Sequence, residues 1–338
     1  MTKNEPCDEQ WYLTGDSKYN LDIKAKEMWK YLNKTTNKKK VTVAIIDEGV
    51  NINNKQIQKS IWSNSNEIKN NNKDDDNNGF VDDYNGWNFC DNNNDVSDIK
   101  NSLSSHGTKI AGVMVADNNK GKITGICSKG LVRIMPIKVI SADDDIINVE
   151  TGSIKNLIKA IKYAENNGAQ ICNISLNTDK ENIELKNVME KSKMLFVVSS
   201  GNGGTRGKNI DKIKSYPASW QLPNMITVCN LKSNGRVNSK SNYGKESVDI
   251  GAPGTDIYGL DNYEEYSYGT GSSYAVPVVT GLAAMIYSCN TGITSEKCKE
   301  IILSSSKKER GIELKVSKGR VLDCAESIKA LVKMGKGD

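Results

Sequence analysis

Runs of apolar, β-branched residues recur along the chain, and they are nearly continuously hydrophobic rather than strictly alternating. A strand that is covered on both faces gives this pattern. We therefore predict buried strands at residues 41–47, 132–140, 169–176, 195–201 and 225–231.

The segments between these runs carry apolar residues at helical spacing, for example at residues 154–161 and 185–189. Strands that alternate with helices indicate a parallel sheet, because each helix returns the chain to the same end of the sheet. The predicted fold class is α/β, with a mostly parallel central sheet and helices on both faces.

Residues 64–98 break this rhythm, because they are crowded with Asn and Asp and contribute little to a core. Asparagine runs also occur elsewhere, at residues 51–54 for example, so part of this pattern is compositional bias. We interpret the segment as an insertion within one domain that spans residues 1–338.

Composition excludes some classes of function. The 338 residues carry a formal net charge of +5, but the basic residues are spread along the chain, so a nucleic-acid partner is not favoured. No apolar segment approaches the roughly 18 residues of a membrane span, and the N-terminus has no apolar signal core. These features predict a soluble protein.

The eight cysteines show no spacing typical of a zinc site. Cys172 and Cys229 lie inside predicted strands, where a cysteine acts as a small buried hydrophobic residue. Cys289 and Cys298 are close in sequence and separated by a polar turn. Their spacing suits a local disulfide, which would favour a secretory route, and equally suits two free thiols.

Two residues stand where open α/β sheets place reactive groups, beyond the carboxyl ends of strands. Asp47 ends the first predicted strand, and His106, the chain's one histidine, precedes the helix-like segment 109–116. A lone histidine is more often structural than catalytic when nothing else marks it. Here the surrounding sequence favours a catalytic role for His106.

Four sequence blocks resemble those of subtilisin-like serine proteases, the subtilases of peptidase family S8. Asp47 lies in AIIDEGV, His106 in SHGTKIAGVMVA and Asn202 in VVSSGNGG, and GTGSSYAVPVVTG follows in the family's order. The similarity runs from Gln10 to about Ala330. It implies a three-layer subtilisin-like fold and a serine endopeptidase.

The nucleophile of the fourth block is identified by counting. Residues 269–271 look like a Gly-Thr-Ser whose serine has become glycine, but the family's serine precedes an alanine by two residues and a proline by four. Ala275 and Pro277 therefore give this role to Ser273. Because proline is tolerated in a first helical turn, Pro277 also predicts a helix start near Ser273. Taken alone, the serine is more often an N-cap than a nucleophile.

The resemblance implies a role for each residue. His106 takes the proton of Ser273 as its oxygen attacks a peptide carbonyl, and Asp47 orients the imidazole. Asn202 and the backbone N–H of Ser273 hold the developing oxyanion. An acyl-enzyme then forms and is cleared by water.

The resemblance also implies that the substrate adds as a strand at an exposed edge. The predicted substrate-binding residues are Ser175, Leu176, Asn177 and Gly201. Asn177 stands where the family usually has glycine, so the approach of the substrate backbone is expected to differ.

Other positions depart from the family pattern. Glu48 follows Asp47, and this second carboxylate would raise the pKa of His106 if it points inward and do little if it points outward. Lys109 replaces a second histidine of the family, and Tyr274 stands where methionine is frequent. We expect these changes to tune activity.

The polar insertion has oxygen-bearing side chains at the alternating spacing of a calcium loop, with glycine at the turn. The twelfth position is Asn85 and no helices flank the loop, so an EF-hand is not favoured. The predicted ligands are Asp74, Asp76, Asn78, Phe80, Asp82 and Asp83. Similar loops bind calcium in many subtilases, and the alternative is a solvated acidic loop.

A second family calcium site is only partly matched. Asn119 fits a ligand position, but Gln56 stands where the family has aspartate, so binding should be weaker there.

These features predict a calcium-stabilised serine endopeptidase, expected to be monomeric and secreted or held in a secretory vesicle. Its partners would be protein or peptide substrates and an inhibitory propeptide that we do not recognise in this chain. The Asn and Lys bias suggests a protozoan parasite. The alternatives are a catalytically impaired subtilase-like protein that binds peptides or partners, and a calcium-binding module on a subtilase scaffold.

Overall fold

The computed structural model describes residues 5–15, 21–33, 38–98, 105–127, 130–140, 151–263 and 265–334. A nine-stranded sheet crosses the molecule, and its neighbouring strands are parallel except for the outermost β10–β11 pair. In spatial order the strands are β10 (Lys307–Lys308), β11 (Arg320–Val321), β7 (Ile250–Pro253), β6 (Met225–Leu231), β5 (Leu195–Ser199), β4 (Ile171–Ile174), β1 (Val41–Asp47), β3 (Val132–Lys138) and β2 (Trp87–Asn88).

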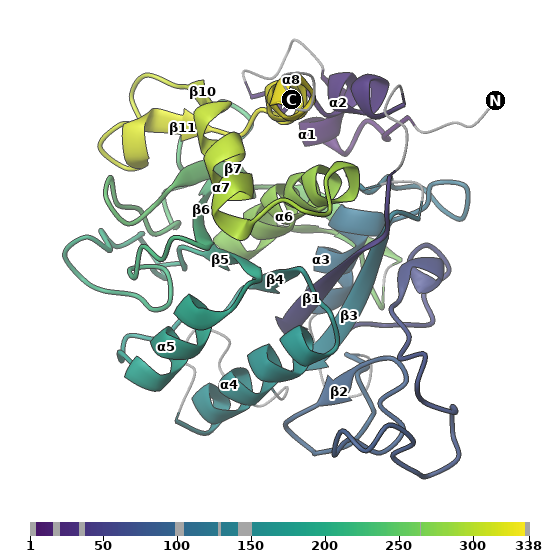
Figure 1. Ribbon diagram of the computed structural model, residues 1–338. Coiled ribbons are helices and arrows are strands. Elements are labelled where there is room, and N and C mark those ends of the chain that lie inside the picture. The colour runs from purple at the N-terminus through teal and green to yellow at the C-terminus, as the bar shows by residue number, and fades with distance from the viewer. Residues whose placement is uncertain are drawn as a thin grey trace.

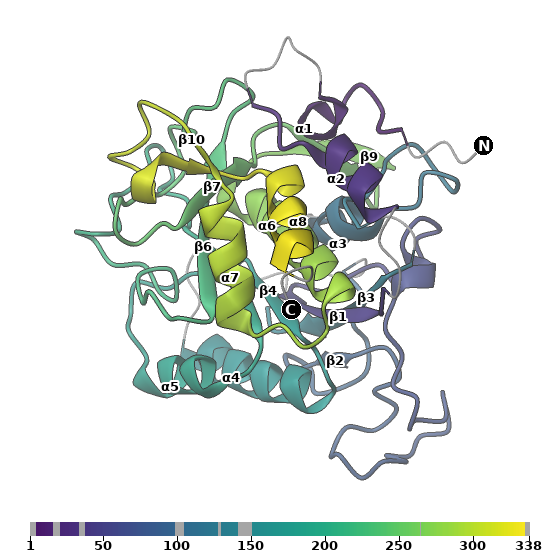
Figure 2. The ribbon, with the colours of Figure 1, turned by 45° about the horizontal axis from the view of Figure 1, so that its top comes forward.

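Helices cover both faces of this sheet, as Figures 1 and 2 show. Side chains of β1 alternate between two cores: Val43 and Ile45 join one, and Ala44 and Ile46 join the other. On the first face lie α1 (Trp11–Thr14), α2 (Ala25–Leu32), α3 (His106–Val115), α6 (Ser272–Cys289), α7 (Ser295–Ser304) and α8 (Cys324–Met334). On the second face lie α4 (Thr151–Asn166) and α5 (Ile183–Lys191). The predicted three-layer α/β fold is confirmed.

Among the residues that the structure describes, α6 is long and apolar enough to cross a membrane, but 83% of it is buried inside the molecule. The sequence prediction that no apolar segment approaches this length was therefore wrong. The helix packs against the sheet and against α3, so its apolar surface faces protein on nearly every side.

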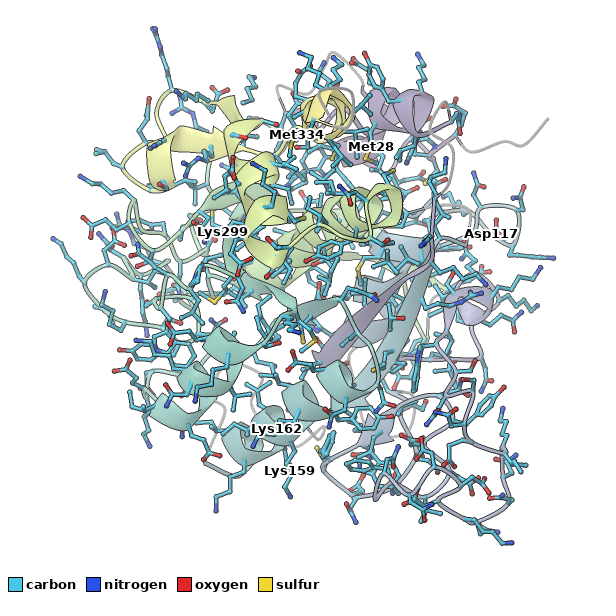
Figure 3. All side chains as sticks on the ribbon, in the orientation of Figure 1. Met28, Asp117, Lys159, Lys162, Lys299 and Met334 are labelled. Atoms are coloured by element: carbon cyan, nitrogen blue, oxygen red, sulfur yellow. The ribbon has the colours of Figure 1, made fainter. Side chains whose placement is uncertain are left out.

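The second and last described helices, α2 and α8, lie side by side. The backbone N–H of Cys324, at the start of α8, donates to Ile23 just before α2 at 2.8 Å. Met28 of α2 and Met334 of α8 lie near each other in Figure 3. Because α8 also contacts α6, the paired α2 and α8 helices lie over α6.

The polar insertion projects beyond the β2 edge of the sheet (Figure 1). It begins after the short 3-10 helix η1 (Gln58–Ser60), and apart from β2 it consists of turns. Asn and Asp side chains accept hydrogen bonds from nearby backbone N–H groups through much of it, as these residues commonly do in turns.

A two-stranded antiparallel sheet leads into α6. It pairs β8 (Ile257–Leu260) with β9 (Tyr266–Gly269). The short 3-10 helix η2 (Ser317–Gly319) is a separate element that immediately precedes β11. The sequence pattern did not predict β8 and β9, because they are short and their exposed tyrosines mask the alternation.

The structure holds Cys289 and Cys298 as free thiols, so the disulfide interpretation is not supported. Cys298 is fully buried in the core on α7, whereas Cys289 ends α6 and is partly exposed. Burial raises the pKa of both thiols, which keeps them protonated and unreactive.

Candidate active site

The first part of the site joins the end of β1 to the start of α3. Asp47 is the last residue of β1, and His106 is the first residue of α3. His106 Nδ1 lies 2.8 Å from Asp47 Oδ1, and both side chains are buried. A carboxylate in this position fixes the ring orientation and the tautomer of an imidazole.

Two glycines allow these elements to approach so closely. A Cβ atom on Gly107 would lie 1.9 Å from the backbone oxygen of Gly49, so any larger residue would push α3 away from β1. Gly49 itself has φ +117°, a conformation that other residues rarely adopt. The glycine after His106 is therefore a requirement of the packing.

Ser273 is the second residue of α6, next to Asn202 from the loop after β5. A Cβ atom on Gly271 would lie 3.2 Å from Ser273 Oγ and 3.4 Å from Asn202 Nδ2. The hydroxyl and the amide thus converge over the same glycine.

Hydrogen bonds fix which end of the Asn202 amide faces this space. Asn202 Oδ1 accepts from the backbone N–H of Ser272 at 3.1 Å and from its hydroxyl at 3.2 Å. Because the oxygen is engaged there, the Nδ2 donor is presented toward Gly271 and Ser273.

Pro277 lies six residues into α6, one turn later than a first-turn proline. Proline has no N–H, so the carbonyl of Ser273, four residues earlier, loses its helical donor. The hydroxyl of Ser175 lies 3.3 Å from that carbonyl oxygen and donates to it. This contact ties the end of β4 to the first turn of α6.

Tyr274 connects the two parts of the site. Its ring lies beside the His106 ring, with centroids 5.2 Å apart at an interplanar angle of 56°. His106 therefore lies against the first turn of α6, where Ser273 is located.

Glu48 points inward and is only 3% exposed. Its Oε1 accepts the backbone N–H of His106 at 2.9 Å. Ser105, the N-cap residue of α3, offers no side-chain cap, so Glu48 satisfies a free donor of this helix from outside it.

Lys109 is also buried, on the side of α3 that faces β8 and β9. Its ammonium group donates to Ser267 and lies 3.7 Å from Asp261 Oδ2. Gly259 of β8 leaves room for its aliphatic stem. The residue that replaces the family's histidine thus anchors the β8–β9 hairpin to α3.

The charges around His106 shift its pKa. Burial opposes the charged imidazole, but the charge and hydrogen bond of Asp47 and the charge of Glu48 outweigh it, while Lys109 acts the other way. The pKa of His106 is raised above its ordinary value. We expect its charge change to fall at a higher pH than that of a free histidine.

A pocket of about 180 Å³ opens beside Ser273 and Asn202. Three of the four predicted substrate-binding residues line it: Ser175, Asn177 and Gly201. The side chain of Leu176 does not, because alternation along the chain directs it into the core with α4 and α5.

In the polar insertion the structure gathers three carboxylates. One oxygen from each of Glu67, Asp76 and Asp83 lies within 4.8 Å of the others. Asp83 Oδ2 also accepts the hydroxyl of Tyr163 on α4 at 2.7 Å, and Asn64 donates to both aspartates. The cluster is therefore built against the body of the molecule.

Glu67 was missed by the sequence analysis, because it precedes the ligand pattern and joins the cluster only when the loop folds back. Its Oε1 accepts the backbone N–H groups of Asp75 and Asp76. Its Oε2 is buried and has no hydrogen-bond partner. Burial raises the pKa of Glu67 and of Asp83.

Two predicted ligands lie outside this cluster. The carboxylate of Asp74 accepts from the backbone of Asn78 and Gly79, and that of Asp82 accepts from the backbone of Asn71 and Asn72. Both therefore shape turns. Asn78 stays close, because its Nδ2 donates to Asp83, and Phe80 packs its ring against Tyr163.

The residues predicted for the second calcium site are engaged separately. Gln56 donates to the hydroxyl of Tyr266 and fills the space over Gly121. Asn119 is exposed and donates to Asp117.

Comparison with known proteins identifies the family. The sequence profile described as "Subtilase family" matches residues 38–319. The chain is 30% identical over 314 residues to "Subtilisin-like protease 1" of Plasmodium berghei, which covers 87% of this chain and 51% of that protein. It is 28% identical to the "Major intracellular serine protease" of Bacillus subtilis, covering 88% and 82%.

Solved structures show the same fold. A protease of Pseudoalteromonas arctica superposes with a TM-score of 0.76 at 19% identity, covering 98% of this chain and all of that one. A cold-adapted subtilisin-like serine proteinase gives a TM-score of 0.63 at 23% identity, covering 84% and 88%.

The chain spans about half of the length of its first curated relatives, "Subtilisin-like protease 1" and the "Thermophilic serine proteinase" of a Bacillus species. The matched profile nevertheless includes Asp47, His106, Asn202 and Ser273 in order. The chain belongs to the subtilase family.

Proposed function

We propose that this chain is a serine endopeptidase in which Ser273 is the nucleophile, His106 the general base and Asp47 the residue that orients it. The observation that carries the proposal is the 2.8 Å contact of Asp47 with His106 next to the first turn of α6. A hydroxyl at a helix N-terminus gains from the helix dipole once an oxyanion forms beside it.

The reaction follows from these placements. His106 Nε2 takes the Ser273 proton as Oγ bonds to the peptide carbonyl carbon, and the imidazolium that forms is stabilised by Asp47. The proton then passes to the leaving amine, the peptide C–N bond breaks, and an acyl-enzyme remains. Water attacks this ester by the same route in reverse and releases the acid.

Asn202 Nδ2 and the backbone N–H of Ser273 would bind the carbonyl oxygen as it becomes negative. The support is the fixed amide orientation, since Asn202 Oδ1 is engaged by Ser272. Such donors stabilise the transition state more than the substrate, so they act on kcat.

The test is labelling with a fluorophosphonate probe, which reacts with activated serines. We expect modification of Ser273, and its loss in Ser273→Ala and His106→Ala. Ser304→Ala on α7 is the matched control and should label normally. Normal folding without any labelling of the unaltered chain would overturn the proposal and favour a peptide-binding protein without activity.

We also propose that the insertion binds a calcium ion through Glu67, Asp76 and Asp83. The donors are all carboxylate oxygens, which a hard divalent cation prefers. Three clustered carboxylates repel one another, and the buried Glu67 Oε2 lacks a partner, so a cation between them removes both costs. The ion would supply structural stability to the loop and take no part in the reaction.

A further inference from the structure

The pocket beside Ser273 has a polar lining. Ser175, Ser199, Ser215 and Asn242 are among the residues that line it. Ile213 is the aliphatic side chain among its lining residues, and it is 58% exposed. A purely apolar substrate side chain would therefore separate these polar groups from water without offering them a hydrogen bond.

Two lysines, Lys208 and Lys214, also line this pocket. Among the residues that the structure describes, neither ammonium group has an ion-pair or hydrogen-bond partner. The backbone of Lys208 is held in place, since its N–H donates to Asn242 Oδ1 at 2.8 Å. The backbone of Lys208 is thus fixed beside the pocket, and the ammonium groups of both lysines remain available.

Asp179 is the acidic residue of the same lining. Two ammonium groups against one carboxylate leave one net positive charge around the pocket, and Asp179 partly screens the lysines. The sign of the field therefore favours an anion and disfavours a cation.

We propose that this pocket receives a carboxylate side chain of the substrate, so that the enzyme cleaves after glutamate or aspartate in acidic segments. This proposal rests on the proposed function, because the position of the substrate is defined by the attack of Ser273 on its carbonyl carbon. Ser273 and Asn202 line the same pocket, so the side chain that enters it belongs to the residue whose carbonyl is attacked, called here the carbonyl-side residue. Lys208 and Lys214 are its specificity-determining residues.

The experiment uses three fluorogenic peptides that differ only in having Glu, Gln or Lys as the carbonyl-side residue. We expect kcat/KM to fall from Glu to Gln to Lys. Glu and Gln have nearly the same shape, so their ratio reports charge alone. Because the lysines are exposed, the ratio should shrink as salt is added.

Substitutions of the charged lining residues should change the Glu-to-Gln ratio of kcat/KM in opposite directions. Lys208→Gln and Lys214→Gln should each lower the Glu-to-Gln ratio by about 2–5-fold, as expected for exposed ion pairs. Asp179→Asn should raise it. The control is Lys162→Gln on α4 (Figure 3), across the sheet from α6, which should leave the ratio unchanged.

Fluorophosphonate labelling of Ser273, measured first, separates the two proposals. If Ser273 of the unaltered chain does not label, the proposed function itself is contradicted. A chain that labels but prefers Lys or an apolar carbonyl-side residue overturns the specificity proposal alone. A Glu-to-Gln ratio that stays fixed in both lysine variants overturns it as well.

Discussion

The site at the start of α6 and the polar insertion are stabilised in different ways. Around the site, charged groups have protein partners: Asp47 contacts His106, Glu48 accepts a helix N–H, and Lys109 lies beside Asp261. In the insertion, Glu67 gathers with two aspartates and keeps a buried oxygen without a partner. Asp47 Oδ2 in the site is likewise buried without a hydrogen-bond partner. The two regions therefore differ in how their carboxylates are grouped: those of the site each contact a donor or a cationic side chain, whereas in the insertion three carboxylates lie together.

The largest effect is expected from Gly107→Ala. The added Cβ would meet the Gly49 oxygen at 1.9 Å, so α3 must move and carry His106 away from Asp47. We expect a loss of about 3 kcal/mol in the free energy of unfolding and little remaining peptide hydrolysis. Urea denaturation and peptide assays measure the two effects.

Gly292→Ala is the matched control, because a Cβ there would meet only the Asn290 side chain at an ordinary distance of 3.7 Å. Equal stabilities for the two variants would show that the approach of α3 to β1 is not fixed by Gly107.

Asn202→Ala removes the oriented amide donor while the core stays packed. We expect kcat to fall by about 100- to 1,000-fold with KM nearly unchanged, because the lost hydrogen bond forms mainly in the transition state. Asn290→Ala, at the opposite end of α6, serves as control. A loss confined to KM would assign Asn202 to substrate binding instead.

Glu67→Gln tests the insertion. Removing one of three carboxylates should raise the calcium concentration for half-maximal thermal stabilisation about tenfold, without changing kcat at saturating calcium. Thermal unfolding at a series of calcium concentrations gives this midpoint, with Glu300→Gln on α7 as control. If calcium leaves the melting temperature of the unaltered chain unchanged, the cluster is a solvated acidic loop.

Glu48→Gln is expected to have the smallest effect, and it concerns pH. The variant keeps an acceptor for the His106 N–H but removes a charge that raises the pKa of His106. The base works only when neutral, so activity should extend to lower pH in the variant. An acid limb at the same pH in both proteins would show that Glu48 acts only as a helix cap.

The sequence predicted the fold well because buried parallel strands read as continuous apolar runs. Residues 41–47 and 225–231 are strands with the predicted bounds. β8 and β9 were not predicted, since short half-exposed strands lack that signal. The order of layers and the position of the strand ends then place Asp47 and His106 at one end of the sheet.

The family blocks located Ser273 and Asn202, and the structure adds how they are held. The link from Ser175 to the carbonyl opposite Pro277 depends on a contact across 98 positions in sequence, which no local pattern reveals. Glu67, Lys208 and Lys214 were missed for the same reason, since folded loops bring Glu67 to the carboxylate cluster and the two lysines to the pocket.

The most direct test of the account uses the chain's single histidine. Its imidazole signal in nuclear magnetic resonance gives the pKa of His106 without ambiguity, and the rate of fluorophosphonate labelling of Ser273 is measured over the same pH range. The account predicts a pKa above the ordinary value for histidine and a labelling rate that rises with the neutral imidazole at that same pKa. A labelling rate that stays constant while His106 titrates would contradict it.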